Sequence, residues 1–564
     1  MRLKHRIPVR VRHYWKFLAG CVAFLLVLTV TLSTVRIRPY VTSSAVGGDV
    51  VTQDIVGTVD LFDETAAHSI TLVYRDADYQ RMLDTFYAEG EKDYIEADLV
   101  IDGTSVPSVG IRLKGNSTLR SLSRNGETPQ GAAGPNGARP GGDQDGGRRQ
   151  RGGQDQPSGT GPAGPEGAPG DGVIPDGADL APNGGGMSRI SLQAEEPENL
   201  PWLIRFDEYV DGRRYQGHRE LSLRVAGMGG GSTVLNEAVT LDLLGDAGEV
   251  AQEYAYTSFT VNDRPTTARL VVEHPDENFT AKIDGSGVLY KSLATGSFTD
   301  QGDDPTAYDD DFKQITMKGS QDLQPVIDLI RWVENASDTE FDEQLADRVD
   351  VESFARYVAW QNLLLNFDDM SGPGRNYYLW YDLTSKKFTV IGWDYNLTFS
   401  GDAGQGPHEQ GRLGGGFRGG GATRPTTGQQ GAETEGGAPP GFTAPDTAPP
   451  GFDPEVADAR PDRAGRPDNG GPGGAGPGGG GHLLKERFLA SETFTQVYED
   501  AYRALYRQVY ADGAALAALD GITEVLSSVD GQDAQTVTDD ANRLRTLVGQ
   551  RTESLAADPV ITQS

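Results

Sequence analysis

The side chains best suited to chemistry lie between residues 366 and 396 of this 564-residue chain. Asp368 and Asp369 come first, and Asn376 stands directly before a strand pattern. Asp394 follows the next strand pattern, so pairing of the two strands as a hairpin brings Asn376 and Asp394 together. Oxygen ligands of this kind suit Mg²⁺. Asp368, eight residues before Asn376, can accept a proton from an attacking hydroxyl group.

Two interpretations of these residues stay open at this level. Asp and Asn at strand ends are common turn formers, so the residue types alone are also explained by turn chemistry. The order of an Asp, an Asn and a second Asp beyond the next strand is the one in which protein kinases place their base and metal ligands. The kinase strings His-Arg-Asp and Asp-Phe-Gly are absent from this stretch.

The elements that must position these residues predict an α+β fold, strand-rich in the first half and helix-rich in the second. Hairpin turns are predicted at Asp102-Gly103 and Asn262-Asp263. A helix from Leu235 to Leu243 is expected to end at Gly245, with Ser232 or Thr233 as its cap. Strands are predicted at 69–74, 94–101, 106–113, 202–206, 221–225, 255–261, 268–273, 377–381 and 387–391, and further helices at 77–87, 322–335, 351–366, 491–505, 515–528 and 534–557.

Two stretches rich in Gly and Pro interrupt this pattern. Residues 121–190 and 401–480 together hold 45 of the 74 Gly of the chain. Such segments cannot bury enough apolar surface to order themselves. Disordered inserts are therefore predicted over 121–199 and 401–482.

The N-terminus predicts a membrane anchor. Six basic residues precede residues 17–35, which are uncharged and long enough, at about 28 Å, to span the hydrocarbon layer. Only Arg36 and Arg38 follow, so we expect a cytoplasmic tail at 1–16, a transmembrane helix at 17–35, a stalk at 36–65 and an extracytoplasmic bulk. This makes the chain a single-pass protein of the cell membrane. A cleaved signal peptide, or a lipoprotein modified at Cys21, are the alternatives.

Charge and cysteine content exclude several classes. The chain has 82 acidic and 50 basic residues, a net charge of −32, which repels phosphate backbones and argues against a nucleic-acid partner. Cys21 is the single cysteine, which excludes a disulfide framework and a Cys-based zinc site. The acidic run around Asp309-Asp310-Asp311 fits a solvated loop or a calcium loop.

The stretch 366–396 resembles the signature of the spore-coat CotH kinase-like family, an atypical protein-kinase-like group. The similarity rests on Asn366-Phe367-Asp368, on Asn376-Tyr377-Tyr378-Leu379-Trp380, and on Trp393-Asp394-Tyr395-Asn396. Blocks at 109–117, 204–209, 217–223, 235–238 and 272–273 are also similar, as is the last helix with Arg551 and Leu555. Trp380 replaces the usual Tyr, 273–276 departs from the family pattern, and Gly227–Gly231 lacks the lysine of a phosphate loop.

The resemblance implies a two-lobed kinase-like domain made of 66–120, 200–400 and 483–560, which binds ATP with Mg²⁺ or Mn²⁺ and phosphorylates protein Ser or Thr. It implies that Asp368 is the catalytic residue, with Asp369 as its neighbour, and that Asn376 and Asp394 hold the metal. Glu237 is expected to orient a phosphate-binding cation, for which Lys114 and Arg205 are the candidates. Lys114 and Arg205 are otherwise surface residues, and Glu273 lies near the adenine or is a plain surface carboxylate.

The sequence thus predicts a membrane-anchored, CotH-like protein kinase, with a basic or neutral acceptor segment favoured by its acidic charge. The alternative is a non-catalytic envelope or spore-coat-like structural or binding protein on the same scaffold. A third hypothesis keeps the nucleotide but transfers a nucleotidyl group. The joint presence of Asp368, Asn376 and Asp394 favours catalysis, because a pseudo-enzyme is expected to lose at least one of them.

Overall fold

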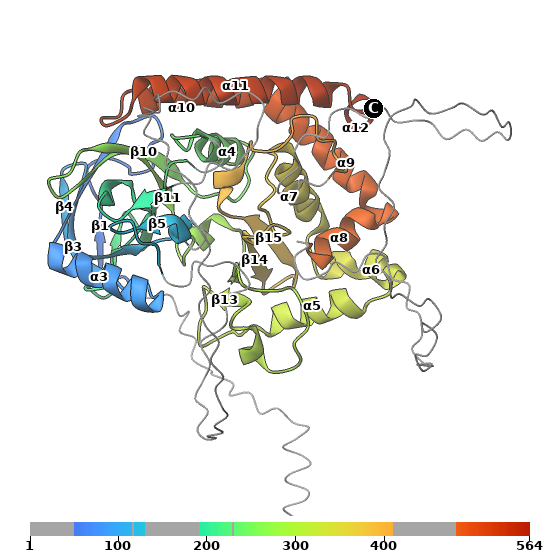
Figure 1. Ribbon diagram of the computed structural model, residues 1–564. Coiled ribbons are helices and arrows are strands. Elements are labelled where there is room, and N and C mark those ends of the chain that lie inside the picture. Colours follow the sequence, from blue (N-terminus) through green and yellow to red (C-terminus); the bar gives the residue numbers. More distant parts are fainter. Residues whose placement is uncertain (1–49, 116–117, 130–190, 228–230, 410–480, 564) are drawn as a thin grey trace, which may run out of the picture.

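A closed seven-stranded barrel forms one side of the molecule (Figure 1). The computed structural model describes residues 50–115, 118–129, 191–227, 231–409 and 481–563. The barrel order is β10-β11-β9-β7-β4-β3-β2, and the parallel pairing of β10 with β2 closes it. Its strands are β2 (His68–Tyr74), β3 (Ile95–Ile101), β4 (Thr104–Leu113), β7 (Trp202–Arg205), β9 (Glu220–Leu223), β10 (Tyr254–Val261) and β11 (Thr267–Glu273). Side chains alternate between buried and more exposed along β2, as expected for a strand with one face in a core.

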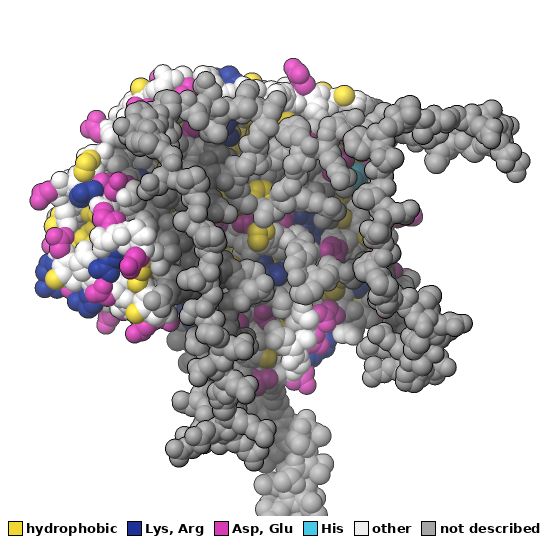
Figure 2. All heavy atoms as spheres, in the orientation of Figure 1, with side chains coloured by type: hydrophobic (Ala, Val, Ile, Leu, Met, Phe, Trp, Pro, Cys, Tyr) yellow, Lys and Arg dark blue, Asp and Glu magenta, His cyan; other side chains and the backbone are white. Residues whose placement is uncertain are grey.

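Short elements decorate the barrel. Helix α3 (Asp76–Glu89) follows β2 and buries Tyr79, Met82, Leu83 and Phe86. Two parallel pairs lie outside it: β1 (Gln53–Ile55) with β8 (Arg213–Tyr215), and β5 (Leu122–Ser123) with β6 (Leu192–Gln193). In Figure 2 acidic and basic side chains alternate over the described barrel surface at the left.

A four-stranded sheet of order β13-β12-β14-β15 lies beside the barrel, among the helices (Figure 1). Its strands are β12 (Gly287–Ser292), β13 (Phe312–Gln314), β14 (Tyr377–Asp382) and β15 (Phe388–Gly392). Strands β14 and β15 pair antiparallel with Tyr377 opposite Gly392. The hairpin predicted at 377–391 is therefore confirmed.

Helices build most of the remaining described residues, and one large core joins them to both sheets. Good caps start several of them: Ser337 forms a capping box, and Asp350, Ser491 and Asp533 each accept a hydrogen bond from the first turn. The helices are α4 (Leu235–Asp246), α5 (Gln324–Asn335), α6 (Asp338–Gln344), α7 (Val351–Leu363), α8 (Leu483–Ala490), α9 (Glu492–Tyr506), α10 (Ala514–Ser527), α11 (Ala534–Ala556) and α12 (Pro559–Thr562). The fold is thus a mixture of α and β elements, as predicted.

The start of α4 differs from its prediction. Neither Ser232 nor Thr233 caps it, because the residue at the cap position is Val234, in a left-handed conformation with φ +58°. Instead the carboxylate of Asp540, on α11, accepts hydrogen bonds from the backbone N–H groups of Ser232 (2.7 Å) and Thr233 (2.8 Å). A distant helix therefore fixes the backbone directly before α4.

The predicted stalk and insert boundaries need correction. Residues 50–65 belong to the folded part, since β1 pairs with β8 and Leu61 is fully buried. The edges of both inserts are also folded: β5 and β6 lie within 121–199, and Asn362 donates to the carbonyls of Gly406 and Pro407. The remainder of each insert, 130–190 and 410–480, lies outside the described residues.

The predicted location in the membrane is also corrected. Across the ranges that the structure describes, no helix has both the length and the apolar character needed to cross a bilayer. The segment 17–35, on which that prediction depended, lies outside those ranges.

Candidate active site

Asp368 lies in a tight loop between α7 and β14, where backbone and side-chain donors fix its carboxylate. Gly374 N–H donates to Oδ1 at 2.5 Å, and Asn376 Nδ2 donates to Oδ2 at 3.0 Å. A Cβ atom on Gly374 would lie 2.6 Å from Asp368 Oδ2, so only glycine allows this approach. The loop therefore holds Asp368 and Asn376 in contact.

Asp368 is poised to exchange a proton near neutral pH. Burial, together with the charges of Asp394 and Asp369, raises its pKa to about 7 against the opposing hydrogen bonds from Gly374 and Asn376. An acid with a pKa near the working pH is suited to general-base catalysis. The charge of Asp394 contributes to this shift, so the two carboxylates lie close enough to interact electrostatically.

Asp369 points elsewhere. Its carboxylate pairs with the ammonium group of Lys485 on α8, and both side chains are buried. Its other oxygen accepts a hydrogen bond from Ser371 N–H at 2.7 Å. Asp369 is thus committed to a contact that ties the loop to α8, which leaves Asp368 as the carboxylate facing Asn376.

Asp394 follows β15, at the same end of the β14–β15 hairpin as Asn376, which precedes β14. Trp393 N–H donates to the carbonyl of Asn376 at 3.3 Å, which extends the pairing of β14 and β15 by one residue. Asp394 then turns into the left-handed region, at φ +61°. Helix α4 lies against the following turn, because Asn236 Nδ2 donates to the carbonyls of Asn396 (2.7 Å) and Thr398 (3.2 Å).

Arg224, directly after β9, joins Glu237 to Asp394. Its Nη2 lies 2.5 Å from Glu237 Oε1, and its Nη1 lies 3.0 Å from Asp394 Oδ1. Burial raises the pKa of Glu237 to about 7, against the opposing charge of Arg224. The carbonyl of Arg224 accepts a hydrogen bond from Arg269 Nε at 2.9 Å, which fixes the backbone at this point.

Three cations surround the ring of Trp393. The charged groups of Lys114, Lys291 and Arg224 lie 4.7, 4.9 and 5.1 Å from the ring centroid, within cation–π range. Burial lowers the pKa of Lys291 to about 8 and that of Lys114 well below its usual range. Tyr378 lies edge-on to Trp393, and within the described residues its buried hydroxyl has no hydrogen-bond partner. Such a cluster of positively charged side chains is suited to an anionic ligand.

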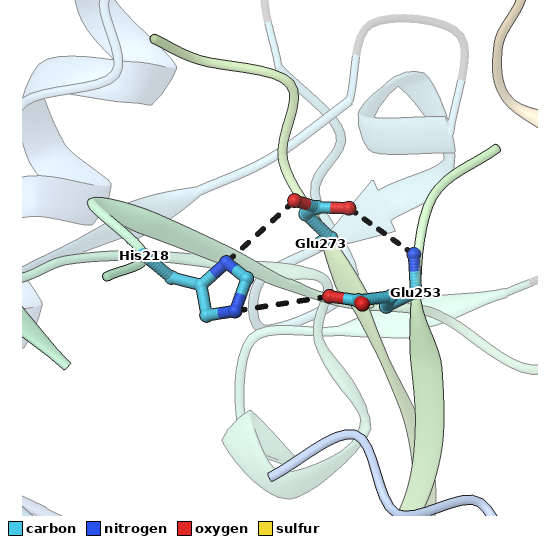
Figure 3. A group of neighbouring side chains, drawn as sticks. All are labelled: His218, Glu253 and Glu273. Atoms are coloured by element: carbon cyan, nitrogen blue, oxygen red, sulfur yellow. Dashed lines mark hydrogen bonds and ion pairs between the residues drawn. The ribbon is translucent and has the colours of Figure 1, made fainter. Parts of the chain in front are cut away.

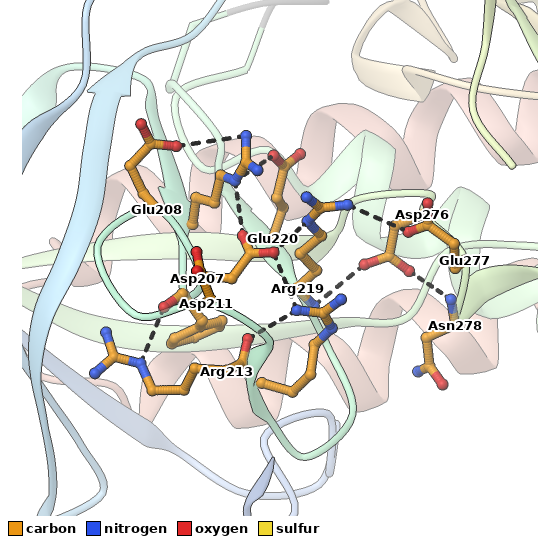
Figure 4. A network of polar contacts seen from close by, with 12 residues as sticks. Asp207, Glu208, Asp211, Arg213, Arg219, Glu220, Asp276, Glu277 and Asn278 are labelled. Atoms are coloured by element: carbon orange, nitrogen blue, oxygen red, sulfur yellow. Dashed lines mark hydrogen bonds and ion pairs between the residues drawn. The ribbon is translucent and has the colours of Figure 1, made fainter. Parts of the chain in front are cut away.

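The structure separates the two predicted phosphate-binding candidates. Lys114 is half-buried over Trp393, so it is not a plain surface lysine. Arg205 belongs to a different network: its Nε lies 2.7 Å from Asp207 Oδ1 and 3.9 Å from Glu220 Oε1. Figure 4 labels both of these acidic partners. Burial of Arg205 is outweighed by Asp207, which raises the pKa of the guanidinium.

Glu273 is not a surface carboxylate either. Its side chain is 1% exposed at the end of β11, where Lys282 Nζ lies 2.6 Å from Oε2. Burial raises its pKa to about 7. Within the described residues, the carboxylate of Glu273 contacts Lys282, His218 and the backbone N–H of Glu253. None of these three residues belongs to the cluster around Trp393.

The acidic loop is engaged within the fold. Asp311 Oδ1 accepts a hydrogen bond from Ser297 N–H at 2.6 Å, and Asp304 caps a short turn through Thr306 N–H. Asp300, just before the loop, pairs with Arg331 at 3.0 Å. These contacts account for Asp300, Asp304 and Asp311 by local structure.

Arg224, Lys291 and Trp393 were not predicted as site residues. Arg224 belongs to the segment 221–225, which was predicted only as a strand without a role in the site. Lys291 lies in β12, a strand that the sequence analysis did not predict. The signal that could have found Arg224 is the need for a buried cation opposite Glu237, since a buried carboxylate needs a partner. That argument requires a cation near Glu237, but it does not identify which residue of the chain supplies it.

The donor set fits a divalent cation. Asn376 makes both of its contacts through Nδ2, so its amide oxygen remains an acceptor. Asp394 Oδ1 is buried and, in the part of the chain described, accepts no hydrogen bond; Arg224 meets it only as an ion pair. An amide oxygen and an under-satisfied carboxylate are hard oxygen ligands of the kind that Mg²⁺ or Mn²⁺ takes beside substrate phosphates.

Comparison with known proteins bears on this geometry. Residues 190–439 match the family model described as CotH kinase protein. A search of curated proteins gives no match. The matched range holds Arg224, Glu237, Asp368, Asn376 and Asp394, whereas Lys114 and Lys485 lie outside it. Over that range the chain is similar to the CotH kinase family, which indicates a kinase-like protein.

Proposed function

We propose that this chain is a CotH-like protein kinase, which transfers the γ-phosphoryl group of ATP to Ser or Thr of a protein with Mg²⁺ or Mn²⁺. In this proposal the barrel and the helical part act as two lobes that enclose the nucleotide. The observation that carries the proposal is the bridge from Glu237 through Arg224 to Asp394, next to the cations around Trp393. Protein kinases likewise pair a helix Glu with a phosphate-binding cation beside a metal-binding Asp.

The charges of the cluster support phosphate binding. Lys114, Lys291 and Arg224 bring positive charge, and Glu237 and Asp394 only partly balance it. Phosphoryl transfer needs mainly positioning and neutralisation of the charge on the phosphoryl oxygens. We assign Arg224, rather than Arg205, as the cation that Glu237 orients, with Lys114 as a second phosphate contact.

Asp368 is assigned as the base. Its contact with Asn376 supports a position at the edge of the proposed metal site, from which it would accept the proton of an acceptor hydroxyl. Asn376 and Asp394 would hold the metal ion, which when bound neutralises charge on the phosphates and orients them. Asp369 stabilises the loop through Lys485 instead of taking part in the transfer.

The test uses the full chain with γ-labelled ATP, Mg²⁺ or Mn²⁺, and a Ser-rich acceptor protein. We expect transfer of label by the parent protein, and its loss in the D368N and D394N variants. The matched control is E524Q, which removes an exposed carboxylate on α10. Mass spectrometry of the product separates a phosphoryl from a nucleotidyl group. Equal label incorporation by the parent, D368N and D394N would contradict the assignment, and ATP binding without transfer would support a non-catalytic scaffold.

A further inference from the structure

A second group of ligand-type side chains lies away from the proposed active site. His218, Glu253 and Glu273 converge from the turn between β8 and β9, the segment before β10, and the end of β11 (Figure 3). One ligand atom from each lies within 4.8 Å of the others. The imidazole of His218 and the carboxylate of Glu273 are buried, and the carboxylate of Glu253 is 47% exposed. The group is therefore anchored in the fold and open on one side.

The spacing inside the group is wrong for hydrogen bonds. His218 Nδ1 lies 3.6 Å from Glu273 Oε1, and His218 Nε2 lies 3.8 Å from Glu253 Oε2. Hydrogen bonds between such atoms are about 2.7–3.2 Å long. Two ligands bound to one ion at about 2.0–2.2 Å each are separated by about 3.4 Å in a tetrahedral site. Because one ion binds a single imidazole nitrogen, only one of these two separations can be a distance between ligands of the same ion. The distance of 3.6 Å from His218 Nδ1 to Glu273 Oε1 is close to the value for a tetrahedral site, and the group offers one ligand atom per residue within 4.8 Å of the others.

Glu273 carries an unsatisfied atom in this group. Its Oε1 is buried and, over the described chain, accepts no hydrogen bond, although it faces the imidazole of His218. Its other oxygen is occupied by Lys282 and by the N–H of Glu253 at 3.2 Å. A buried carboxylate oxygen without a donor is costly, so this atom indicates a missing electropositive partner.

Lys282 already brings one cation to the group. Its ammonium lies 2.6 Å from Glu273 and 3.3 Å from Glu253, and its side chain is 29% exposed. A flexible, partly exposed lysine can swing into solvent when a stronger cation arrives. The ring of His218 also packs edge-on against Phe62, with the ring centroids 5.0 Å apart.

We propose that His218, Glu253 and Glu273 form a binding site for one Zn²⁺ ion, and that Lys282 neutralises the two carboxylates while the metal is absent. One imidazole and two carboxylates are a suitable ligand set for Zn²⁺, with a fourth position left to water. The ion would cross-link the ends of β10 and β11 to the turn that precedes β9. This inference does not depend on the proposed kinase activity.

The test measures Zn²⁺ binding to the full chain without nucleotide, by competition with a chromophoric chelator. We expect one ion per chain, and loss of that site in E273Q and in H218Q. K282M removes the competing ammonium and is expected to bind Zn²⁺ several-fold more tightly than the parent. Two controls retain the ion: D394N, altered in the proposed active site, and H408Q, which removes an exposed histidine paired with Glu499.

Lys282 also makes the proposal easy to overturn. If the four residues are only an ion-pair cluster, K282M loses stability and gains no Zn²⁺ affinity. Zn²⁺ binding that survives both E273Q and H218Q, or that disappears in D394N, would also contradict the site. If H218Q fails to fold, the decision rests on E273Q and on the direction of the K282M effect.

Discussion

The guanidinium of Arg224 lies 3.0 Å from the carboxylate of Asp394, and the two residues follow strands of two different sheets. Arg224 follows β9 of the barrel, and Asp394 follows β15 of the sheet among the helices. The same guanidinium holds Glu237 of α4. Because this guanidinium contacts residues of α4 and of the β14–β15 hairpin from a position directly after a barrel strand, its position depends on both the barrel and the helical part. A ligand bound to Arg224 therefore depends on both parts as well.

Arg224 should be needed for nucleotide binding. In R224M the carboxylates of Glu237 and Asp394 lose their shared cation, and breaking a buried ion pair costs about 3–5 kcal/mol of stability. We expect ATP affinity to fall about tenfold or more, since a charge-assisted contact contributes about 1.5–3 kcal/mol. Isothermal titration with ATP and Mn²⁺ measures the affinity, and chemical denaturation measures the stability.

The control for R224M is R545Q, which breaks an exposed ion pair with Asp520 on α10. Exposed pairs contribute little, so we expect stability and ATP affinity near those of the parent protein. Parent-like ATP affinity in R224M would exclude Arg224 from the phosphate site.

The rate should depend on pH through Asp368 and Lys291. Burial raises the pKa of Asp368 to about 7, so the carboxyl is protonated, and inactive as a base, below that pH. Burial lowers the pKa of Lys291 to about 8, so the lysine loses its positive charge above that pH. We expect kcat/KM to rise through about pH 7 and to fall above about pH 8, because this parameter reports ionisation in the free enzyme.

Lys291→Arg separates the two limbs of that profile. Arginine keeps its charge at alkaline pH, so K291R should lose the fall above about pH 8 and keep the rise through about pH 7. An unchanged alkaline limb in K291R would assign that limb to another group, such as Lys114.

The sequence predicted the elements of the site better than its electrostatics. The hairpin turn at Asp382–Lys386 and the alternating strands were visible because local patterns determine them. The predicted proximity of Asn376 to Asp394 follows from that hairpin alone, because Tyr377 pairs with Gly392. Arg224 could not be chosen over Lys114 or Arg205, because its partners Glu237 and Asp394 come from distant elements.

The same reasoning explains other errors. The start of α4 depends on Asp540, more than 300 positions later, so no local capping rule could predict it. The strands β1, β5 and β6 are two or three residues long and have no periodicity to detect. They form because each finds a partner strand outside the barrel, β8 for β1 and β5 together with β6, which is a tertiary effect.

Lys485 should stabilise the fold through Asp369. K485M leaves a buried carboxylate without its cation, and we expect the free energy of unfolding to fall by about 3–5 kcal/mol. The double variant K485M/D369N removes the stranded charge and should recover much of that loss. Urea denaturation followed by circular dichroism measures both. If D369N alone abolished phosphoryl transfer in a fully folded protein, Asp369 would have to be treated as catalytic.

Gly392 should be required for the placement of Asp394. A Cβ atom at Gly392 would lie 1.8 Å from the hydroxyl oxygen of Tyr395 and 2.6 Å from the adjoining ring carbon. G392A must therefore displace either the strand end or Tyr395, which is buried in the turn directly after Asp394. Overpacking of this kind costs about 1–3 kcal/mol, and here it also moves a proposed metal ligand. We expect G392A to reduce phosphoryl transfer more than it reduces stability.

A second substitution tests this explanation. Y395F removes the hydroxyl but leaves the ring carbon, so G392A/Y395F should recover part of both losses. A double-mutant cycle on activity and on unfolding free energy measures that coupling, and strictly additive effects would show that the two residues do not determine the position of Asp394 together.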